Sequence, residues 1–176
     1  MTTLQPQHHD NSVREAVATG EHRAMTTERH GFTLIELLVA ITVLGALAAI
    51  AIPEFANYRR AAQNGQAIAD IRKIDLELQV YRRQNNTYPA TLADLGVSIN
   101  NDPWNQSYKY LKIEGANKTE QNKARKDHFL VPLNSDFDLY SIGPDGLTAA
   151  PLTSVDSLDD IVRANEGRYV GLGSDY

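Results

Sequence analysis

The chain contains no cysteine. This absence excludes disulfide bonds, thiol nucleophiles and thiolate metal ligands. The chain also lacks a block of basic residues, and its formal net charge is only −5, so we expect no nucleic-acid partner. Only one histidine, His128, follows residue 31, and no serine stands beside it in a nucleophile motif. We therefore expect no enzymatic activity.

Long apolar runs are also absent, with one exception at residues 32–52. A helix of this length rises ~1.5 Å per residue and spans the ~30 Å hydrocarbon core of a bilayer. A secretory signal peptide would have a shorter apolar region with a small-residue cleavage site after it. Here the small residue, Gly31, precedes the run and Pro53 follows it. The run therefore predicts a transmembrane helix.

A single carboxylate, Glu36, interrupts this apolar run. An ionisable side chain in lipid costs a few kcal/mol or more, and such residues are rare and usually functional. A plain single-pass anchor explains the length of the run but leaves Glu36 unexplained. We therefore expect Glu36 to have a partner of opposite charge.

The string Gly31-Phe32-Thr33-Leu34-Ile35-Glu36 resembles the processing site of type IV pilins and of the pseudopilins of type II secretion. In that family an inner-membrane prepilin peptidase cuts after the glycine and N-methylates the new terminal phenylalanine. Pro53 stands where the family has a helix-bending proline. The resemblance thus implies cleavage between Gly31 and Phe32, N-methylation of Phe32, and pairing of Glu36 with the terminal amine of a neighbouring subunit.

Residues 1–31 then form a leader peptide. This segment is polar and has no hydrophobic periodicity up to residue 30. Leaders in the family are often only a handful of residues long. Met25 is therefore an alternative start to Met1 and would leave a short leader.

The helix is expected to continue beyond the membrane over residues 53–84. Apolar side chains recur there at spacings of three and four, and they predict an amphipathic helix packed on its own domain. The stripe consists of Ile68, Ile71, Ile74, Leu78 and Tyr81. Pro53 lacks an N–H group and predicts a bend. Pro89 marks the end of the helical region.

Residues 85–176 are expected to form a globular region with a small antiparallel sheet. Segments rich in aromatic and branched residues predict strands. These candidates are Tyr108–Ile113, Phe129–Leu133 and Phe137–Ile142. Residues 91–96 predict a short helical turn closed by Gly96, and residues 114–128 read as a polar loop. A long helix followed by a small sheet indicates the α+β class.

Three further segments restrict the resemblance to one branch of this family. Tyr88-Pro89, Asp102-Pro103-Trp104 and the stretch from Phe137 to Gly146 are similar to those of the major pseudopilins of type II secretion. Trp104 is expected to be a core aromatic. The resemblance implies a self-polymerising subunit of a pseudopilus whose growth drives protein export across the outer membrane.

This resemblance also implies partners and a location. The partners would be copies of itself, minor pseudopilins, the prepilin peptidase and an inner-membrane assembly platform. The subunit would be a single-pass protein of the bacterial inner membrane with its C-terminal domain in the periplasm. A type IV pilin for attachment or motility is an alternative, and so is a membrane-anchored binding domain that never polymerises. The latter predicts that Glu36 is dispensable.

The acidic C-terminal loop is the remaining candidate site. In major pseudopilins a calcium ion fastens this loop, and by resemblance its ligands here are the Ile142 carbonyl and the carboxylates of Asp145, Asp159 and Asp160. Calcium takes six to eight oxygen ligands, and with no disulfide available we expect residues 145–160 to make few apolar contacts that could hold the loop without it. Residues 147–158 form a longer loop than the family has and lack its glycine-rich stretch, so Asp156 is an alternative ligand. The other reading is a solvated acidic loop.

Overall fold

The computed structural model describes residues 31–176, and it contains one long helix, α1, from Leu34 to Asn85. The chain divides into two compact units inside this helix, between Val43 and Leu44. Residues 1–30, with the Met25 alternative, lie outside the described part of the chain.

In the first unit, α1 begins directly after Thr33 and presents its apolar side chains to the surroundings. Phe32, Leu34 and Ile35 are all largely exposed. By length and composition α1 is the one helix of the described residues that could cross a membrane. The predicted apolar helix is thus confirmed, and nothing within residues 31–43 covers it.

In the second unit, α1 continues through Pro53 to Asn85, so the proline does not end the helix. The predicted stripe packs on the globular region: Ile71, Ile74 and Leu78 are buried, and Ala67 joins them. Ile68 is partly buried against the same core. The amphipathic continuation of the helix is therefore confirmed.

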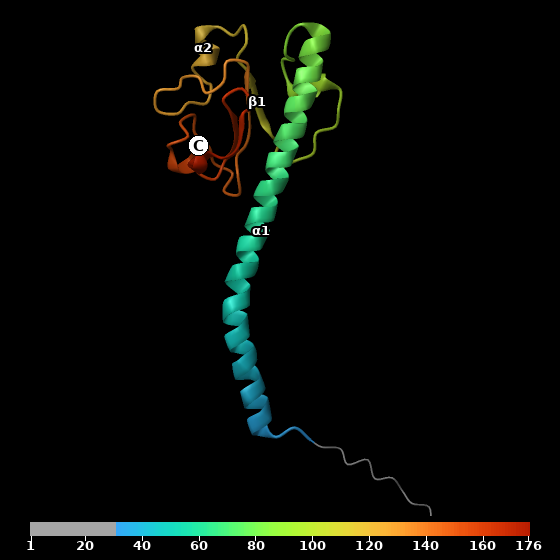
Figure 1. Ribbon diagram of the computed structural model, residues 1–176, viewed down its shortest axis with the longest axis vertical. Coiled ribbons are helices and arrows are strands. Elements are labelled where there is room, and N and C mark those ends of the chain that lie inside the picture. Colours follow the sequence, from blue (N-terminus) through green and yellow to red (C-terminus); the bar gives the residue numbers. More distant parts are fainter. Residues whose placement is uncertain (1–30) are drawn as a thin grey trace, which may run out of the picture. The chain divides into compact units, whose positions relative to one another are not determined.

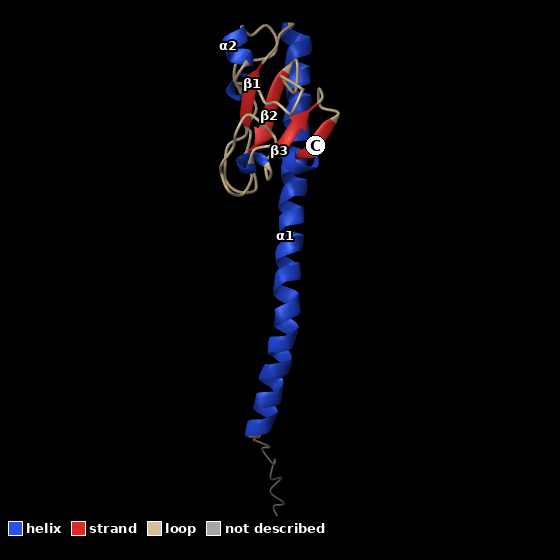
Figure 2. Ribbon diagram, turned by 90° about the vertical axis from the view of Figure 1, so that its left-hand side faces the viewer, coloured by secondary structure: helices blue, strands red, loops and turns tan. Residues whose placement is uncertain are grey.

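The globular region is built on a four-stranded antiparallel sheet in the order β1-β2-β3-β4 (Figures 1 and 2). The strands are β1 (Lys109–Lys112), β2 (Phe137–Ser141), β3 (Ile161–Ala164) and β4 (Tyr169–Leu172). Their register pairs Tyr110 with Leu139, Ser141 with Ile161, and Val162 with Gly171. The α+β class is confirmed.

Apolar side chains cover both faces of this sheet. One core lies between the sheet and α1 and includes Phe137, Leu139 and Ile161, with Trp104 partly buried against it. A second core contains Val162 and Ala164 together with Leu133 and Leu152. The loops that follow α2 (Lys118–Gln121) and β2 supply Leu133 and Leu152, so they cover the face of the sheet opposite α1.

The structure corrects the strand predictions. Phe129–Leu133 is an irregular loop in which Phe129 is 99% exposed, and Pro132 in that run cannot donate to a strand ladder. The polar loop 114–128 contains the short helix α2. Strands β3 and β4 were not predicted. The sequence does carry a hairpin signal there, because Asn165-Glu166-Gly167 lies between two segments that contain β-branched residues. The glycine-closed turn at residues 92–96 is confirmed, with Gly96 at φ 68°.

Candidate functional site

The first candidate site is the N-terminal end of α1. The side chain of Glu36 folds back on Thr33: its Oε2 accepts hydrogen bonds from the Thr33 backbone N–H at 2.8 Å and from the Thr33 hydroxyl at 2.8 Å. The Glu36 N–H donates in return to Thr33 Oγ1 at 3.2 Å. This reciprocal arrangement is a capping box, and it satisfies N–H groups that would otherwise have no partner at the helix start.

From the sequence, Glu36 is treated only as a charge, which does not predict this capping box. The signal was present, since a threonine followed three residues later by a glutamate is the pattern of this motif. The structure places Gly31 and Phe32 immediately before the capped turn, where both are exposed. A cut between them would leave the new terminal amine on Phe32, one residue before Thr33 of the capping box.

The second candidate site is the turn after β2. Gly143 adopts φ 65°, and a Cβ on it would stand 2.6 Å from the Asp159 carbonyl oxygen and 2.7 Å from the Asp159 carboxylate. Asp159 Oδ2 accepts a hydrogen bond from the Asp145 N–H at 3.3 Å. The structure thus places two of the predicted calcium ligands, Asp145 and Asp159, next to each other at this turn.

Two side chains that sequence reasoning missed hold this turn. Asp102 is buried; its Oδ1 accepts from the Trp104 and Gln106 N–H groups, and its Oδ2 accepts from the Ser141 hydroxyl. Gln106 Nε2 donates to the Gly143 carbonyl at 2.8 Å. The segment Asp102-Pro103-Trp104 therefore fixes the position of the end of β2.

The fourth predicted ligand, Asp160, has a different set of partners. Its Oδ2 accepts hydrogen bonds from Arg125 Nη2 at 2.6 Å and from the Thr148 hydroxyl at 2.7 Å. The carboxylate is 0% exposed. Burial raises the pKa of Asp160, while the Thr148 hydrogen bond and the positive charge of Arg125 oppose that rise.

These positions do not fit the predicted calcium site. Within residues 31–176 no three carboxylate or imidazole side chains gather closely enough to hold a metal ion. Asp145 is exposed and its Oδ1 accepts from the Leu147 N–H, Asp156 is exposed, and Asp160 is bonded to an arginine. Calcium binding stays a prediction from the resemblance.

The loop itself is better anchored than its composition predicts. Leu152 is 2% exposed and packs in the second core. The Ser157 side chain bonds to both the N–H and the carbonyl of Ala149, and Lys126 pairs with Pro151 in an isolated bridge. One core side chain and these polar contacts hold the loop, although we expected few apolar contacts there.

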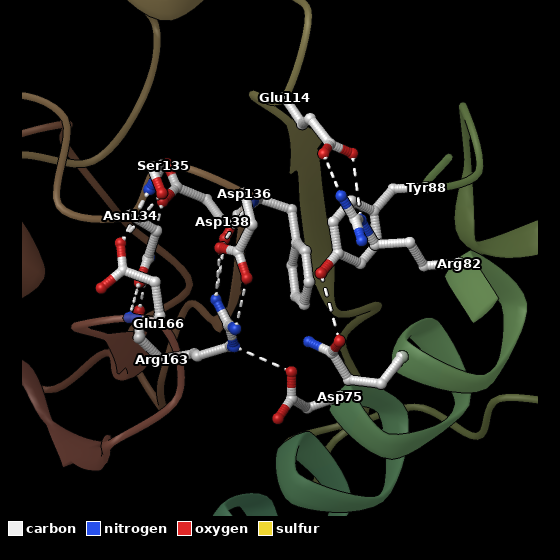
Figure 3. A network of polar contacts seen from close by, with 12 residues as sticks. Asp75, Arg82, Tyr88, Glu114, Asn134, Ser135, Asp136, Asp138, Arg163 and Glu166 are labelled. Atoms are coloured by element: carbon white, nitrogen blue, oxygen red, sulfur yellow. Dashed lines mark hydrogen bonds and ion pairs between the residues drawn. The ribbon is translucent and has the colours of Figure 1, made fainter. Parts of the chain in front are cut away.

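A polar network ties α1 to the sheet near the first core (Figure 3). Arg163 on β3 is 1% exposed and donates to Asp75 on α1 at 2.9 Å and to Asp136 at 2.7 and 2.8 Å. Its guanidinium also stacks over the ring of Phe137, 4.0 Å from the centroid. The exposed Arg82–Glu114 pair lies beside this network. These contacts attach the globular region to α1.

Two family models match the chain. The prokaryotic N-terminal methylation motif matches residues 27–52, which include the capped helix start. The type II secretion system (T2SS) protein G model matches residues 54–157, more than half of the chain. That match ends before Asp159 and Asp160, and before β3 and β4.

Individual relatives give the same result. The type II secretion system core protein G of Dickeya chrysanthemi is 28% identical over 146 residues, covering 81% of this chain and 91% of that protein. The core protein G of Pseudomonas aeruginosa is 32% identical over 122 residues, covering 68% and 86%. That of Escherichia coli is 30% identical, covering 69% and 86%. No solved structure matches the chain. The chain belongs to the type II secretion system protein G family, the major pseudopilins.

Proposed function

We propose that this protein is the principal structural subunit of a type II secretion pseudopilus. The observation that carries the proposal is the capped helix start: a processing motif is followed by an uncovered apolar helix whose only acid lies one turn from the cut. The subunit is processed by prepilin peptidase and polymerises, and the growing filament drives proteins across the outer membrane.

Assembly depends on a partner exchange at Glu36. In the single subunit Glu36 is bonded to its own Thr33. Cleavage creates a positively charged amine at Phe32, and in a staggered filament the amine of an incoming subunit reaches Glu36 of the subunit already in place. Apolar stripes tolerate several registers, whereas a carboxylate left unpaired in an apolar bundle is costly. Methylation keeps the positive charge of the amine.

The proposal includes a location and partners. The subunit begins as a single-pass protein of the inner membrane with its C-terminal domain in the periplasm, and moves into the periplasmic pseudopilus on assembly. Beyond copies of itself, it meets the prepilin peptidase, the assembly platform of the inner membrane and minor pseudopilins. The family membership and the uncovered apolar helix support this assignment.

Processing at Gly31 is the first test. A side chain at Gly31 would meet the active site of the peptidase, so Gly31→Val should leave an uncut precursor in the membrane fraction. Gly45→Val is the matched control, because Gly45 also has no atom within 4 Å of an added Cβ but lies inside the apolar span. The readout is the intact mass of the membrane-bound protein.

The expected wild-type and Gly45→Val masses are those of a methylated chain that begins at Phe32. A chain that begins at Phe32 in the Gly31→Val variant, or at another residue in the wild type, contradicts the proposal. Loss of secretion in a strain without the protein, with motility and attachment unchanged, separates this function from that of a type IV pilin.

A further inference from the structure

A buried guanidinium lies on the inner side of the C-terminal loop. Arg125, which follows α2, is 3% exposed. Its Nη2 donates to Asp160 Oδ2 at 2.6 Å and its Nη1 donates to Thr148 Oγ1 at 2.5 Å. Thr148 Oγ1 also donates to the same Asp160 oxygen. The two ends of the loop therefore meet at one arginine side chain.

The same residue is also fixed to the sheet. The backbone N–H of Arg125 donates to the buried carboxylate of Asp138 on β2 at 2.5 Å, and its carbonyl accepts from the Leu133 N–H. Its guanidinium stacks on Tyr140, also on β2, 4.4 Å from the ring centroid. Arg125 thus joins three segments that are distant in sequence: the region after α2, strand β2, and the loop 147–160.

A cation that bridges two ends of an acidic loop and fixes them to the sheet is what the calcium ion was expected to provide. We propose that in this chain the guanidinium of Arg125 is that cation, and that the exported domain folds and assembles without calcium. A metal close to Asp160 would meet a fixed positive charge already in contact with this carboxylate, and the two cations would repel each other.

Two atoms of this pair have no hydrogen-bond partner, Arg125 Nε and Asp160 Oδ1. Asp160 Oδ1 is the only oxygen of that carboxylate that a metal ion could take without displacing the arginine. The alternative hypothesis is that calcium binds Oδ1 of Asp160 together with Asp159 and Asp145.

The first experiment uses the full-length wild-type protein in detergent, melted in calcium chloride and in a chelator. Trp104, the single tryptophan, packs against the first core and reports unfolding by fluorescence. The expected result is that the midpoint temperature of thermal unfolding is the same in both solutions. A midpoint that rises with calcium overturns the proposal, because a ligand of the folded state alone must stabilise it. This comparison needs no variant.

The second experiment removes each half of the pair. Arg125→Met and Asp160→Asn should each lower the midpoint by on the order of 10 °C, because each leaves a buried group without its partner. The double variant should lose less than the sum of the two changes. If Arg125→Met yields no folded protein, Arg125→Lys is tested in its place. Lysine keeps the positive charge but lacks the planar guanidinium that donates two hydrogen bonds. The midpoint of Arg125→Lys should therefore fall by less than the midpoint of Asp160→Asn.

Asp145→Asn is the matched control, since Asp145 is an expected calcium ligand that has no contact with Arg125. Its midpoint should stay close to that of the wild type in both solutions. Additive losses from Arg125→Met and Asp160→Asn, or an unchanged midpoint in either, contradict the arginine cross-link. A calcium-dependent rise that Asp145→Asn removes assigns the role to the metal instead.

Discussion

At the scale of single residues, Glu36 combines two roles that substitutions can separate. In the subunit it caps α1 through Thr33, and in the filament we propose that it binds a neighbour's amine. A glutamine keeps the capping pattern but has no charge. Glu36→Gln should therefore be cleaved normally, because the cut lies before it, and should yield few filaments.

The other substitutions at this end follow the same logic. Glu36→Ala should also be cleaved but assemble poorly, and Glu36→Asp should be intermediate because it keeps the charge on a shorter side chain. Thr33→Val removes the hydroxyl of the cap and keeps the carboxylate, so it should still assemble. Filament yield after overexpression is the measurement. Normal filaments from Glu36→Gln would show that the cap alone matters and would contradict the proposed pairing.

The same scale shows what could not be predicted from the sequence. The resemblance implied that Asp160 is a calcium ligand, but nothing in the sequence pairs it with Arg125, which lies 35 residues away. Arg125 stands in a charged stretch next to Lys126 and Asp127, where a solvated side chain is the ordinary expectation. Contacts between distant polar residues leave no periodicity, so only the folded chain reveals them.

At the scale of elements, the attachment of α1 to the sheet depends on Arg163. This side chain is buried between Asp75 on α1 and Asp136 at the start of β2. Removing one partner of a buried ion pair costs about 3–5 kcal/mol, because the other charges are left uncompensated. Arg163→Met should lower the free energy of unfolding by about that amount in denaturant titrations of the full-length protein.

Arg82→Met is the matched control for this prediction. Arg82 pairs with Glu114, but 44% and 37% of the two side chains are exposed, and exposed ion pairs contribute little to stability. The control should therefore unfold almost as the wild type does. Equal losses from the two substitutions would contradict the view that Arg163 fixes the sheet on the helix.

The elements also divide into those that could and could not be predicted. The helix followed from its apolar run and from the stripe at Ile71, Ile74 and Leu78, because both are periodic signals within one segment. β1 and β2 were found because each lies in a segment rich in aromatic and branched residues. β3 was missed because Arg163 interrupts its apolar pattern, and β4 was missed because Gly171 lies inside it. Arg163 can be buried because it forms ion pairs with Asp75 and Asp136.

At the scale of the whole molecule, the protein combines a domain whose sheet is covered on both faces with a helix start that is exposed among the described residues. The exposed apolar side chains of residues 32–52 require a bilayer before assembly and other copies of the same helix after it. Family membership, the methylation motif and this uncovered helix all indicate polymerisation as the function of the chain.

The most direct test of that claim is the intact mass of subunits from filaments sheared off cells that overexpress this protein together with its secretion machinery. The account predicts filaments composed of one species, a chain that begins at Phe32 and carries a methyl group on its terminal amine. Protein that remains in the membrane as a cleaved subunit and never appears in filaments would contradict it, and would indicate a membrane-anchored domain that does not polymerise.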